Sequence, residues 1–465
     1  MHISRLVKNT VNVLLLLGFS FSMTACKTKT SEFPSIPDPS EESVTESVVE
    51  TEPSVEPKHT KLTVALPYDS STISYLFKLY YAKNEGLMAD NLDGLNVDLE
   101  FLDSVSVPIS VENVYVPDDG VSYETAKNWG EDAPDIYLTN DLKGTVDGGL
   151  CLPLNDYLYS NELLDADNVY SSSIFSCMYD GSLYAIPHYC SIPMIYGNLD
   201  YVESGSDIDF KCSYDELFKH IDSIKEGIGE DDVLFYKGYQ LLPYMTSYDN
   251  ENDKANSFML DLEYKNDSSK AQKDLEPLLS IIGDRYNDGS FKNFNEDGSD
   301  PVISRNCALW ISSSSELSLW SSYYPNKLYF MQIPSFSSSN TSIPYLTVYP
   351  LCVSSNSKEQ QLAADFAAFV SLDRDALLLI NRLEPKLGYL PLVYSSEVWD
   401  QKISDPQFGY IVSVYENMMP EAVYTPNVID NKLCNTIESK LFACYNELQE
   451  TDESYIISLS DIYEN

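Results

Sequence analysis

The side chains that most often carry catalytic or metal-binding chemistry are few and widely spaced in this chain. Of its four histidines only His188 and His220 lie beyond residue 60, and its nine cysteines form no Cys-x-x-Cys pair. No His-Glu-x-x-His, Gly-x-Ser-x-Gly or phosphate-cradling glycine loop occurs, so the residue spacing offers neither a zinc site nor a nucleophile motif. His188 follows Pro187 and is a candidate site residue, although a structural histidine is the favoured interpretation. We therefore expect no catalysis, no metal and no cofactor.

One loop, residues 293–301, partly imitates a calcium site. Asn293, Asn295, Asp297 and Gly298 stand in the order of a calcium loop. The twelfth position is Ser304, whereas such loops use a bidentate acid there. Calcium binding at this loop stays open as a minor alternative.

Tyrosine is the abundant residue with binding chemistry, since the chain contains 35 tyrosines. Aromatic faces together with acids and amides suit neutral polyols, because they stack on sugar rings and hydrogen-bond at the ring edge. Most of these tyrosines are expected to be half-buried packing. The net charge of −43 argues against nucleic acid and anionic lipid as partners, because both need basic patches. It is compatible with neutral or cationic ligands.

Predicted strands and helices alternate along the chain that carries these residues. The patterns predict a strand at 61–68, a helix at 72–87, a strand at 95–102 and a further strand from Asp135, which is the order of an α/β lobe. The body from residue 61 onward exceeds one compact core, so two lobes are expected. Further along, the patterns predict helices at 213–227, 357–372 and 431–450 and strands at 306–312 and 328–334.

The cysteines beyond the N-terminal region mostly lie within apolar strings. In such settings cysteine behaves as a small buried hydrophobe. Their even number permits disulfides without specifying any pairing. These residues are Cys151, Cys177, Cys190, Cys212, Cys307, Cys352, Cys434 and Cys444.

The N-terminus has the pattern of a secretion signal. Arg5 and Lys8 precede an uncharged apolar run at 11–23, which is too short to span a bilayer comfortably. The next residues complete the stretch Met-Thr-Ala-Cys, which resembles a bacterial lipobox and implies lipidation of Cys26 after removal of residues 1–25. An ordinary secreted protein cut near Ala25 is the alternative. Residues 26–60 are rich in acids, prolines and serines and are expected to form a disordered acidic tether.

The order of several short motifs resembles one known family across most of residues 61–450. The strongest is "DGSLYAIPHYCSIPMIYGNLDYV" at 180–202, and the others are "EDAPDIYLTND", "CLPLNDYL", "SYDELFKHI", "IIGDRYNDGSF", "NCALWIS", "YLTVYPLCVSSNSKEQQLAADFAAFV" and "GYLPLV". In this order they resemble the extracellular solute-binding lipoproteins of ABC importers, in the maltose-binding-like (family 1) branch. Each motif alone is weak, and the ordered set is specific.

The resemblance implies an α/β, two-lobed periplasmic-binding-protein-like fold of type II, with a multi-crossing hinge. The N-terminal lobe would comprise 61–190 plus 345–400, and the C-terminal lobe 191–344 plus 401–465. The chain would cross between lobes near 189–193, 343–350 and 400–405. Ligand binding in the cleft would close the lobes by a hinge motion.

The resemblance also implies where the ligand would sit, namely at the ends of strands and at the first crossing. The candidate ligand-binding residues are Tyr68, Asp69, Asn140, Asp141, Tyr189, Ser313, Ser314 and Trp320, with Ser312 beside them. Sugar-binding relatives often carry a tryptophan on the turn where this chain reads "ISSSSE", so the carbohydrate assignment stays open. Trp310 is expected to pack inward.

The leading hypothesis is a solute receptor on the extracellular face of the cell membrane, lipid-anchored, that is not an enzyme. It would capture a small solute, with carbohydrate as one candidate class, for the permease subunits of an ABC importer. It would act as a monomer, contact the membrane through its lipid anchor only and bind no nucleic acid. The alternatives are a surface adhesion or sensing lipoprotein that keeps the fold, and a secreted glycan hydrolase with paired carboxylates. The ligand stays open among sugars, peptides, amino acids and polyamines.

Overall fold

The protein is described here by a computed structural model, and all but two isolated residues of the described part lie between 61 and 424. Those residues belong to one compact unit, Lys58–Asn465. The expected signal, Cys26, the tether, Cys434, Cys444 and nearly all of the expected helix at 431–450 lie outside the described residues. The described ranges are 61–89, 93–202, 212–229, 232–244, 246–249, 254–257, 280–295, 297–334, 344–385, 388–406, 408–424, 439 and 443.

The first lobe is built on a six-stranded mixed sheet with the strand order β15-β14-β3-β1-β2 and β6 paired to β14. β1, β2 and β3 are parallel, and β14 runs antiparallel to β3 and β6. Buried strands of this kind read as continuous apolar runs, as "LTVAL" does in β1. The strands are β1 (Lys61–Leu66), β2 (Ser110–Tyr115), β3 (Ile136–Leu138), β6 (Ala185–Ser191), β14 (Tyr345–Val353) and β15 (Val423–Tyr424).

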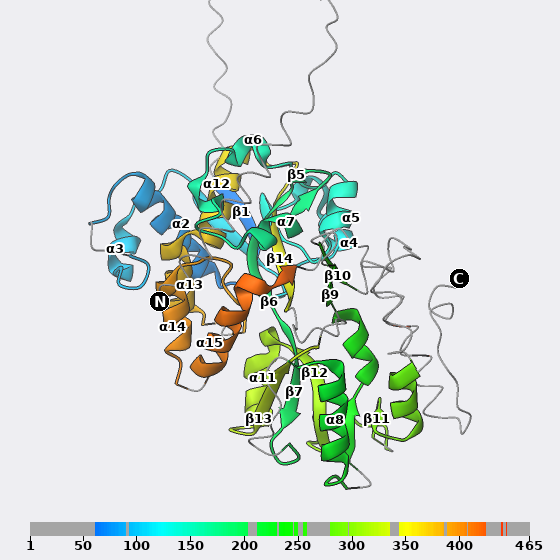
Figure 1. Ribbon diagram of the computed structural model, residues 1–465. Helices are drawn as coiled ribbons and strands as arrows, with labels where there is room; N and C mark the ends of the chain where they lie inside the picture. Colours follow the sequence, from blue (N-terminus) through cyan, green and yellow to red (C-terminus); the bar gives the residue numbers. More distant parts are fainter. Residues whose placement is uncertain are drawn as a thin grey trace, which may run out of the picture. The chain divides into compact units, whose positions relative to one another are not determined.

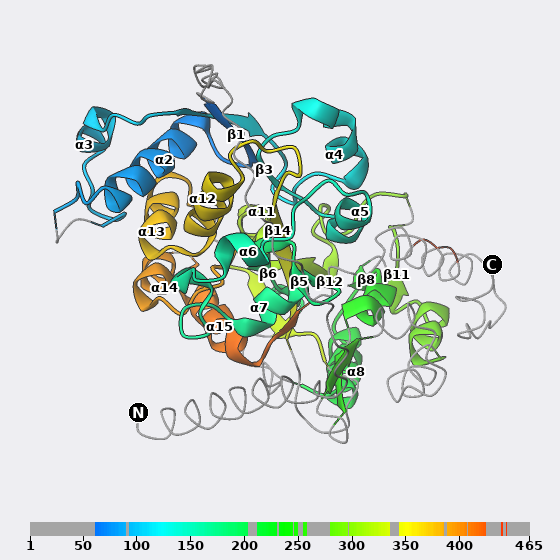
Figure 2. The ribbon, with the colours of Figure 1, turned by 90° about the horizontal axis from the view of Figure 1, so that it is seen from above.

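Helices cover this sheet on both flanks. α2, α12 and α13 lie side by side on one flank, and α4 and α5 lie on the other (Figures 1 and 2). α12 turns its alanines and Phe366 into the core, where Phe366 meets Phe77 edge to face with ring centroids 5.1 Å apart. The helices are α2 (Ser70–Asn84), α3 (Leu99–Ser104), α4 (Tyr123–Trp129), α5 (Leu142–Asp147), α6 (Asn155–Leu158), α7 (Ser171–Ser176), α12 (Gln360–Leu372), α13 (Arg374–Leu383), α14 (Ser396–Ile403) and α15 (Gly409–Met418).

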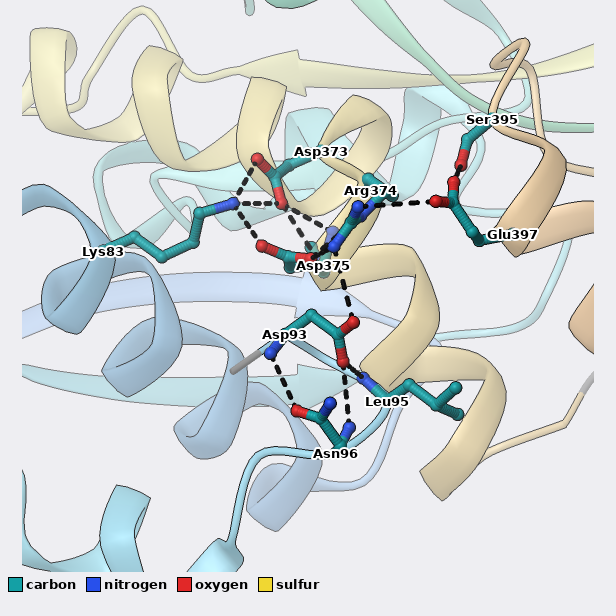
Figure 3. A network of polar contacts seen from close by, with 10 residues as sticks. Lys83, Asp93, Leu95, Asn96, Asp373, Arg374, Asp375, Ser395 and Glu397 are labelled. Atoms are coloured by element: carbon teal, nitrogen blue, oxygen red, sulfur yellow. Dashed lines mark hydrogen bonds and ion pairs between the residues drawn. The ribbon is translucent and has the colours of Figure 1, made fainter. Parts of the chain in front are cut away.

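An ionic network fixes the corner where α2, α13 and α14 meet the loop at residues 93–96 (Figure 3). Lys83 Nζ lies 2.9 Å from Asp373 Oδ2 and 2.7 Å from Asp375 Oδ2. Arg374 reaches Asp93, Asp375 and Glu397 at 3.5, 3.0 and 3.6 Å. Each acid faces a base, so this network is structural and does not present free charge to a ligand.

The second lobe is built on a five-stranded sheet with the order β11-β8-β12-β7-β13. Trp310 of β12 is buried, as expected, and its ring centroid lies 6.0 Å from that of Tyr196 on β7. α8 (Tyr214–Lys225) begins with a capping box between Ser213 and Glu216, which satisfies two free N–H groups. The remaining main elements are β7 (Pro193–Asn198), β8 (Val233–Tyr236), β11 (Phe291–Lys292), β12 (Cys307–Ser313), β13 (Leu328–Gln332) and α11 (Leu317–Tyr323).

The smaller elements are hairpins and single turns. They are the strands β4 (Met178–Tyr179), β5 (Ser182–Leu183), β9 (Thr246–Asp249) and β10 (Lys254–Ser257), and the 3-10 turns η1 (Gly130–Asp132), η2 (Glu162–Leu164), η3 (Gly238–Tyr244), η4 (Ser314–Glu316) and η5 (Met419–Glu421). Among the described residues, no helix is long and apolar enough to cross a membrane.

The chain passes from the first sheet to the second at Ile192, between β6 and β7. A different course from the predicted one follows residue 400. α14 runs through the region of the expected third crossing, α15 packs on α14, and β15 pairs with β14 of the first sheet. Residues 401–424 therefore lie beside the first sheet, although α15 also reaches the second lobe through Tyr415, whose hydroxyl is 3.4 Å from that of Tyr196.

One predicted strand was wrong. Residues 99–102 of the expected strand at 95–102 belong to α3, because Asp98 caps that turn by accepting a hydrogen bond from the Glu100 N–H at 2.9 Å. The true neighbour of β1 is β2 at Ser110–Tyr115. The six cysteines of the described chain are free and buried, which confirms their role as small hydrophobic side chains.

Candidate ligand-binding site

Three tyrosines gather where the first sheet continues toward the second lobe. Tyr189 of β6 stands directly opposite Tyr349 of β14, and Tyr389 follows α13. The ring centroids of Tyr189 lie 5.0 Å from Tyr349 and 4.6 Å from Tyr389, and the last two are 5.7 Å apart. We call Tyr189, Tyr349 and Tyr389 the hinge tyrosine cluster. It offers the aromatic faces that an apolar ring surface or a cation can contact.

Hydrogen bonds hold the cluster in place from both lobes. The Tyr189 hydroxyl donates to the backbone carbonyl of Asp118. The Tyr349 hydroxyl lies 3.1 Å from Ser191 Oγ, and the side chain of Ser315 in η4 also hydrogen-bonds to it. Tyr189 and Tyr349 are thereby fixed before any ligand arrives.

Carboxylates approach the cluster from both lobes. Burial raises the pKa of the Tyr389 hydroxyl, and the nearby charges of Asp118, Asp119 and Glu316 raise it further. Asp118 and Asp119 follow β2 in the first lobe, whereas Glu316 lies in η4 of the second. Asn140 joins the first pair, since its Nδ2 lies 3.3 Å from Asp119 Oδ2. The surroundings of Tyr389 are therefore rich in hydrogen-bond acceptors.

The second lobe contributes a polar triad at the end of β12. The Ser312 hydroxyl donates to Glu316 Oε2. Trp320 Nε1 lies 2.6 Å from Ser312 Oγ and 3.2 Å from Glu316 Oε2. Glu316 is exposed and Trp320 is half-buried, so the triad keeps a polar surface and an indole available to a ligand.

Ser314 has a different role from its neighbours. It is fully buried, accepts the Ile192 N–H at 3.0 Å and donates to the Gly388 carbonyl at 2.8 Å. A Cβ on Gly388 would lie 1.8 Å from the Ser314 carbonyl oxygen. Ser314 thus ties the crossing strand to the loop that carries Tyr389, and its hydroxyl is used for structure. Ser313 caps η4 by accepting the Ser315 N–H.

Tyr68 is buried inside the first lobe. Its hydroxyl lies 2.9 Å from His188 Nε2, and His188 Nδ1 lies 3.0 Å from Ser371 Oγ. Burial, then Glu384, Asp118 and Tyr389, raise the pKa of Tyr68. His188 is therefore held between two hydroxyls, which agrees with its interpretation as structural. Asp69 precedes α2, and its N–H donates to Glu384 Oε1 at 2.7 Å.

A small cavity of about 30 Å³ lies beside Tyr68. This volume is far below the roughly 300–1,000 Å³ of typical ligand pockets. Lys402 lines it, and burial lowers the pKa of this amine to about 7. The polar and aromatic lining residues are Tyr68, His188, Tyr189, Asn381, Glu384, Tyr389 and Lys402.

Asp141 caps a helix. It precedes α5, and its Oδ1 accepts the Gly144 N–H at 2.9 Å. A ligand would therefore compete with this cap for one of its two carboxylate oxygens.

The loop at 293–301 uses its oxygens internally. Asn293 Oδ1 accepts from the Tyr286 hydroxyl, Asn295 pairs with Asn306, and Asp297 Oδ1 accepts the Ser299 N–H. In the described part of the chain, no group of three or more His, Cys, Asp or Glu side chains could hold a metal ion. These contacts give the calcium alternative no support.

The structure thus brings together Asn140, Tyr189, Ser313 and Trp320 from the predicted set, around residues that the sequence reasoning missed. The missed residues are Asp118, Asp119, Tyr349, Tyr389 and Glu316. The Asp-Asp-Gly stretch at 118–120 is a turn signal after a strand, and it would have identified the two aspartates had β2 been placed correctly.

The sheets, the crossing at Ile192 and the polar groups from both lobes define a class of protein: a two-lobed α/β binding protein of type II. A family model described as bacterial extracellular solute-binding protein matches residues 100–409. The match spans more than half of the chain, which therefore belongs to this family. No curated protein matches the chain in sequence.

Solved structures confirm the fold over nearly the whole body. The GacH receptor of Streptomyces glaucescens, whose structures include complexes with acarbose, is 16% identical with a TM-score of 0.55, covering 87% of this chain and 97% of that one. A sugar transporter from Rhizobium etli in an open conformation is 14% identical with a TM-score of 0.61, covering 87% and 98%. A cyclo/maltodextrin-binding protein complexed with maltotetraose is 15% identical with a TM-score of 0.57, covering 88% and 96%. At these identities the likeness establishes the fold.

Proposed function

We propose that this protein is a lipid-anchored extracellular receptor that captures a small solute and delivers it to the permease subunits of an ABC importer. The observation that carries the proposal is the hinge tyrosine cluster, with Asp118, Asp119 and Asn140 on its first-lobe side and the Ser312–Glu316–Trp320 triad on the other. Aromatic faces with acceptors on two sides are what a small polar solute needs. Carbohydrate is one candidate class, because the similar structures are named for sugars, acarbose and maltotetraose.

Binding of this kind would draw the lobes together. β6 and β7 are joined through Ile192 alone, so a small backbone rotation there moves Glu316 and Trp320 relative to Asp118. The solute would then be contacted from both sides.

Thermal unfolding of the protein with single solutes tests the proposal. A ligand that binds the native state alone raises the melting temperature. We expect a rise with at least one sugar, amino acid, peptide or polyamine, and loss of that rise in Tyr389→Ala. A rise that survives in Tyr389→Ala would place the site away from the hinge tyrosine cluster.

The lipid anchor has its own test. Cys26→Ser should move the protein from the membrane fraction into the medium, because the thioether needs the thiol. Cys177→Ser, a change at a buried cysteine of the described chain, is the control and should stay in the membrane fraction. If Cys26→Ser also stays there, the anchor is elsewhere.

A further inference from the structure

The hinge tyrosine cluster is surrounded by negative charge. Asp118, Asp119 and Glu316 all act on Tyr389, and Glu384 acts on neighbouring Tyr68. In the described part of the chain, the cavity beside Tyr189 and Tyr389 is lined by His188, which bonds to Tyr68 and Ser371, and by Lys402. Lys402 is the lysine of this lining. It is buried, which lowers its pKa to about 7, so its charge is partial at neutral pH. Carboxylates therefore dominate the field here.

A buried amide points to a missing partner at the same end of the second sheet. Gln332 ends β13 in register with Met194, which is in turn in register with Ser312. Residues opposite each other on neighbouring strands point to the same face, so Gln332 shares the face on which Ser312 meets Glu316 and Trp320. Gln332 is 1% exposed, and neither atom of its amide has a hydrogen-bond partner. Such a group is costly unless a partner is supplied.

We propose that the solute carries a protonated amine that sits against the hinge tyrosine cluster between Asp118 and Asp119 on one side and Glu316 on the other. This inference rests on the proposed function and narrows its ligand class. An ammonium group is attracted to tyrosine faces and donates up to three hydrogen bonds to carboxylates. The remainder of the solute would extend past Trp320 toward Gln332 and supply the partner that its amide lacks.

Lobe closure gives the physical reason for a cation. Drawing the lobes together brings Glu316 toward Asp118 and Asp119, and like charges brought together oppose closure. A neutral solute leaves this repulsion in place, whereas an ammonium between the carboxylates turns it into attraction. The same acids would therefore select the charged ligand and link its binding to closure.

Two kinds of solute share this chemistry, amino sugars and linear polyamines. Calorimetric titration of the full-length protein with four probes separates them: chitobiose, its uncharged N-acetylated derivative N,N′-diacetylchitobiose, spermidine and maltose. We expect chitobiose or spermidine to bind, and raising the salt from about 0.05 M to about 0.5 M to weaken that binding several-fold. Binding of maltose or diacetylchitobiose without chitobiose or spermidine overturns the amine while keeping the proposed function. Failure of all four probes overturns the amine, and the proposed function then depends on the wider thermal screen.

Single substitutions test which carboxylates contact the amine of the solute. Glu316→Gln and Asp119→Asn keep the shape and remove one carboxylate each, so each should weaken amine binding about tenfold or more. Asp156→Asn changes the net charge equally at an exposed site on α6 and should leave affinity unchanged. Equal losses in all three variants would indicate a general charge effect, and unchanged affinity in Glu316→Gln and Asp119→Asn would place the amine elsewhere. Either result overturns the inference.

Discussion

The ends of β1 and β12 carry similar residues but expose them very differently. After β1, Tyr68 is 3% exposed and bonded to His188, and the Asp69 N–H is held by Glu384. After β12, Glu316 is exposed and Trp320 is half-buried, and both hydrogen-bond to the buried Ser312. Both are strand ends of the kind where ligands bind in α/β folds. Asp69 is exposed, as Glu316 is, so the contrast lies in the aromatic residues: Tyr68 is buried, whereas Trp320 is half-buried.

The difference comes from what packs over each strand end. His188 of β6 and Glu384, just beyond α13, cover the end of β1, whereas α11 beyond β12 turns Trp320 back onto Ser312. A residue's place after a strand therefore indicates that it can reach a site, and the covering elements decide whether it does.

The largest effect on stability is expected at Lys402, which lines the small cavity beside Tyr68. Its folded pKa of about 7 lies below the ordinary lysine value of about 10.4. The unfolded chain thus binds more protons between these two values, so Lys402 makes stability rise with pH through that window and costs most below about pH 7. We expect Lys402→Met to be more stable than the wild type at pH 6–7, by on the order of 3 kcal/mol.

Denaturant unfolding of both proteins from pH 6 to pH 10 checks this. The gap between them should close as the pH rises, because the wild-type amine is then neutral in both states. A constant gap would mean that lost packing or a lost contact, and not the charge, distinguishes the two proteins.

The next largest effect on stability is expected at Gly388, whose carbonyl accepts a hydrogen bond from Ser314. A Cβ there meets the Ser314 carbonyl oxygen at 1.8 Å, so Gly388→Ala must push apart the loop of Tyr389 and η4, which carries Ser314. We expect the free energy of unfolding to fall by about 1–3 kcal/mol. Gly227→Ala, where the nearest atom would be 3.6 Å away, is the matched control in the same denaturation assay. Equal stability of the two variants would show that the contact yields easily.

The sequence allowed more of the fold than of the candidate ligand-binding site to be predicted. The two-lobed α/β fold, Trp310 inside and the Ser213–Glu216 cap follow from local patterns and ordered motifs. The site depends on pairings between distant segments: Tyr189 meets Tyr349 through strand register and Tyr389 through a loop some 200 residues later. Ser312 and Ser314 lie two positions apart and are both buried, but Ser312 bonds to Glu316 and Trp320. Ser314 instead bonds to Ile192 and Gly388, two segments that are distant in sequence.

Tyr68 should matter for stability and not for binding. Tyr68→Phe leaves His188 Nε2 without its hydroxyl partner in a buried place, so we expect a loss of about 1–2 kcal/mol in the free energy of unfolding. Tyr115→Phe, at a side chain that is 66% exposed, should leave stability unchanged. Weaker ligand binding in Tyr68→Phe at unchanged stability would restore Tyr68 to the site.

Two variants of Asp141 test whether its carboxylate only caps α5 or also contacts the ligand. Asp141→Ala removes the acceptor of the Gly144 N–H and should cost about 1 kcal/mol. Asp141→Asn keeps a capping oxygen and should stay close to the wild type in thermal unfolding. If Asp141 contacts an amine, Asp141→Asn will weaken binding although stability is kept. If it is only a cap, both variants will bind the ligand equally.

The smallest effect on stability is expected at Glu316, in η4 directly after β12. Its carboxylate is exposed and accepts from Ser312 and Trp320, and the amide oxygen of Glu316→Gln can accept the same bonds. Exposed interactions of this kind contribute little, so the free energy of unfolding should change by less than about 0.5 kcal/mol. Ligand binding should change far more, because three carboxylates around Tyr389 become two. Chemical denaturation and titration of the same sample compare the two effects. A large loss of stability with binding intact would mean that the end of β12, like the end of β1, serves the fold.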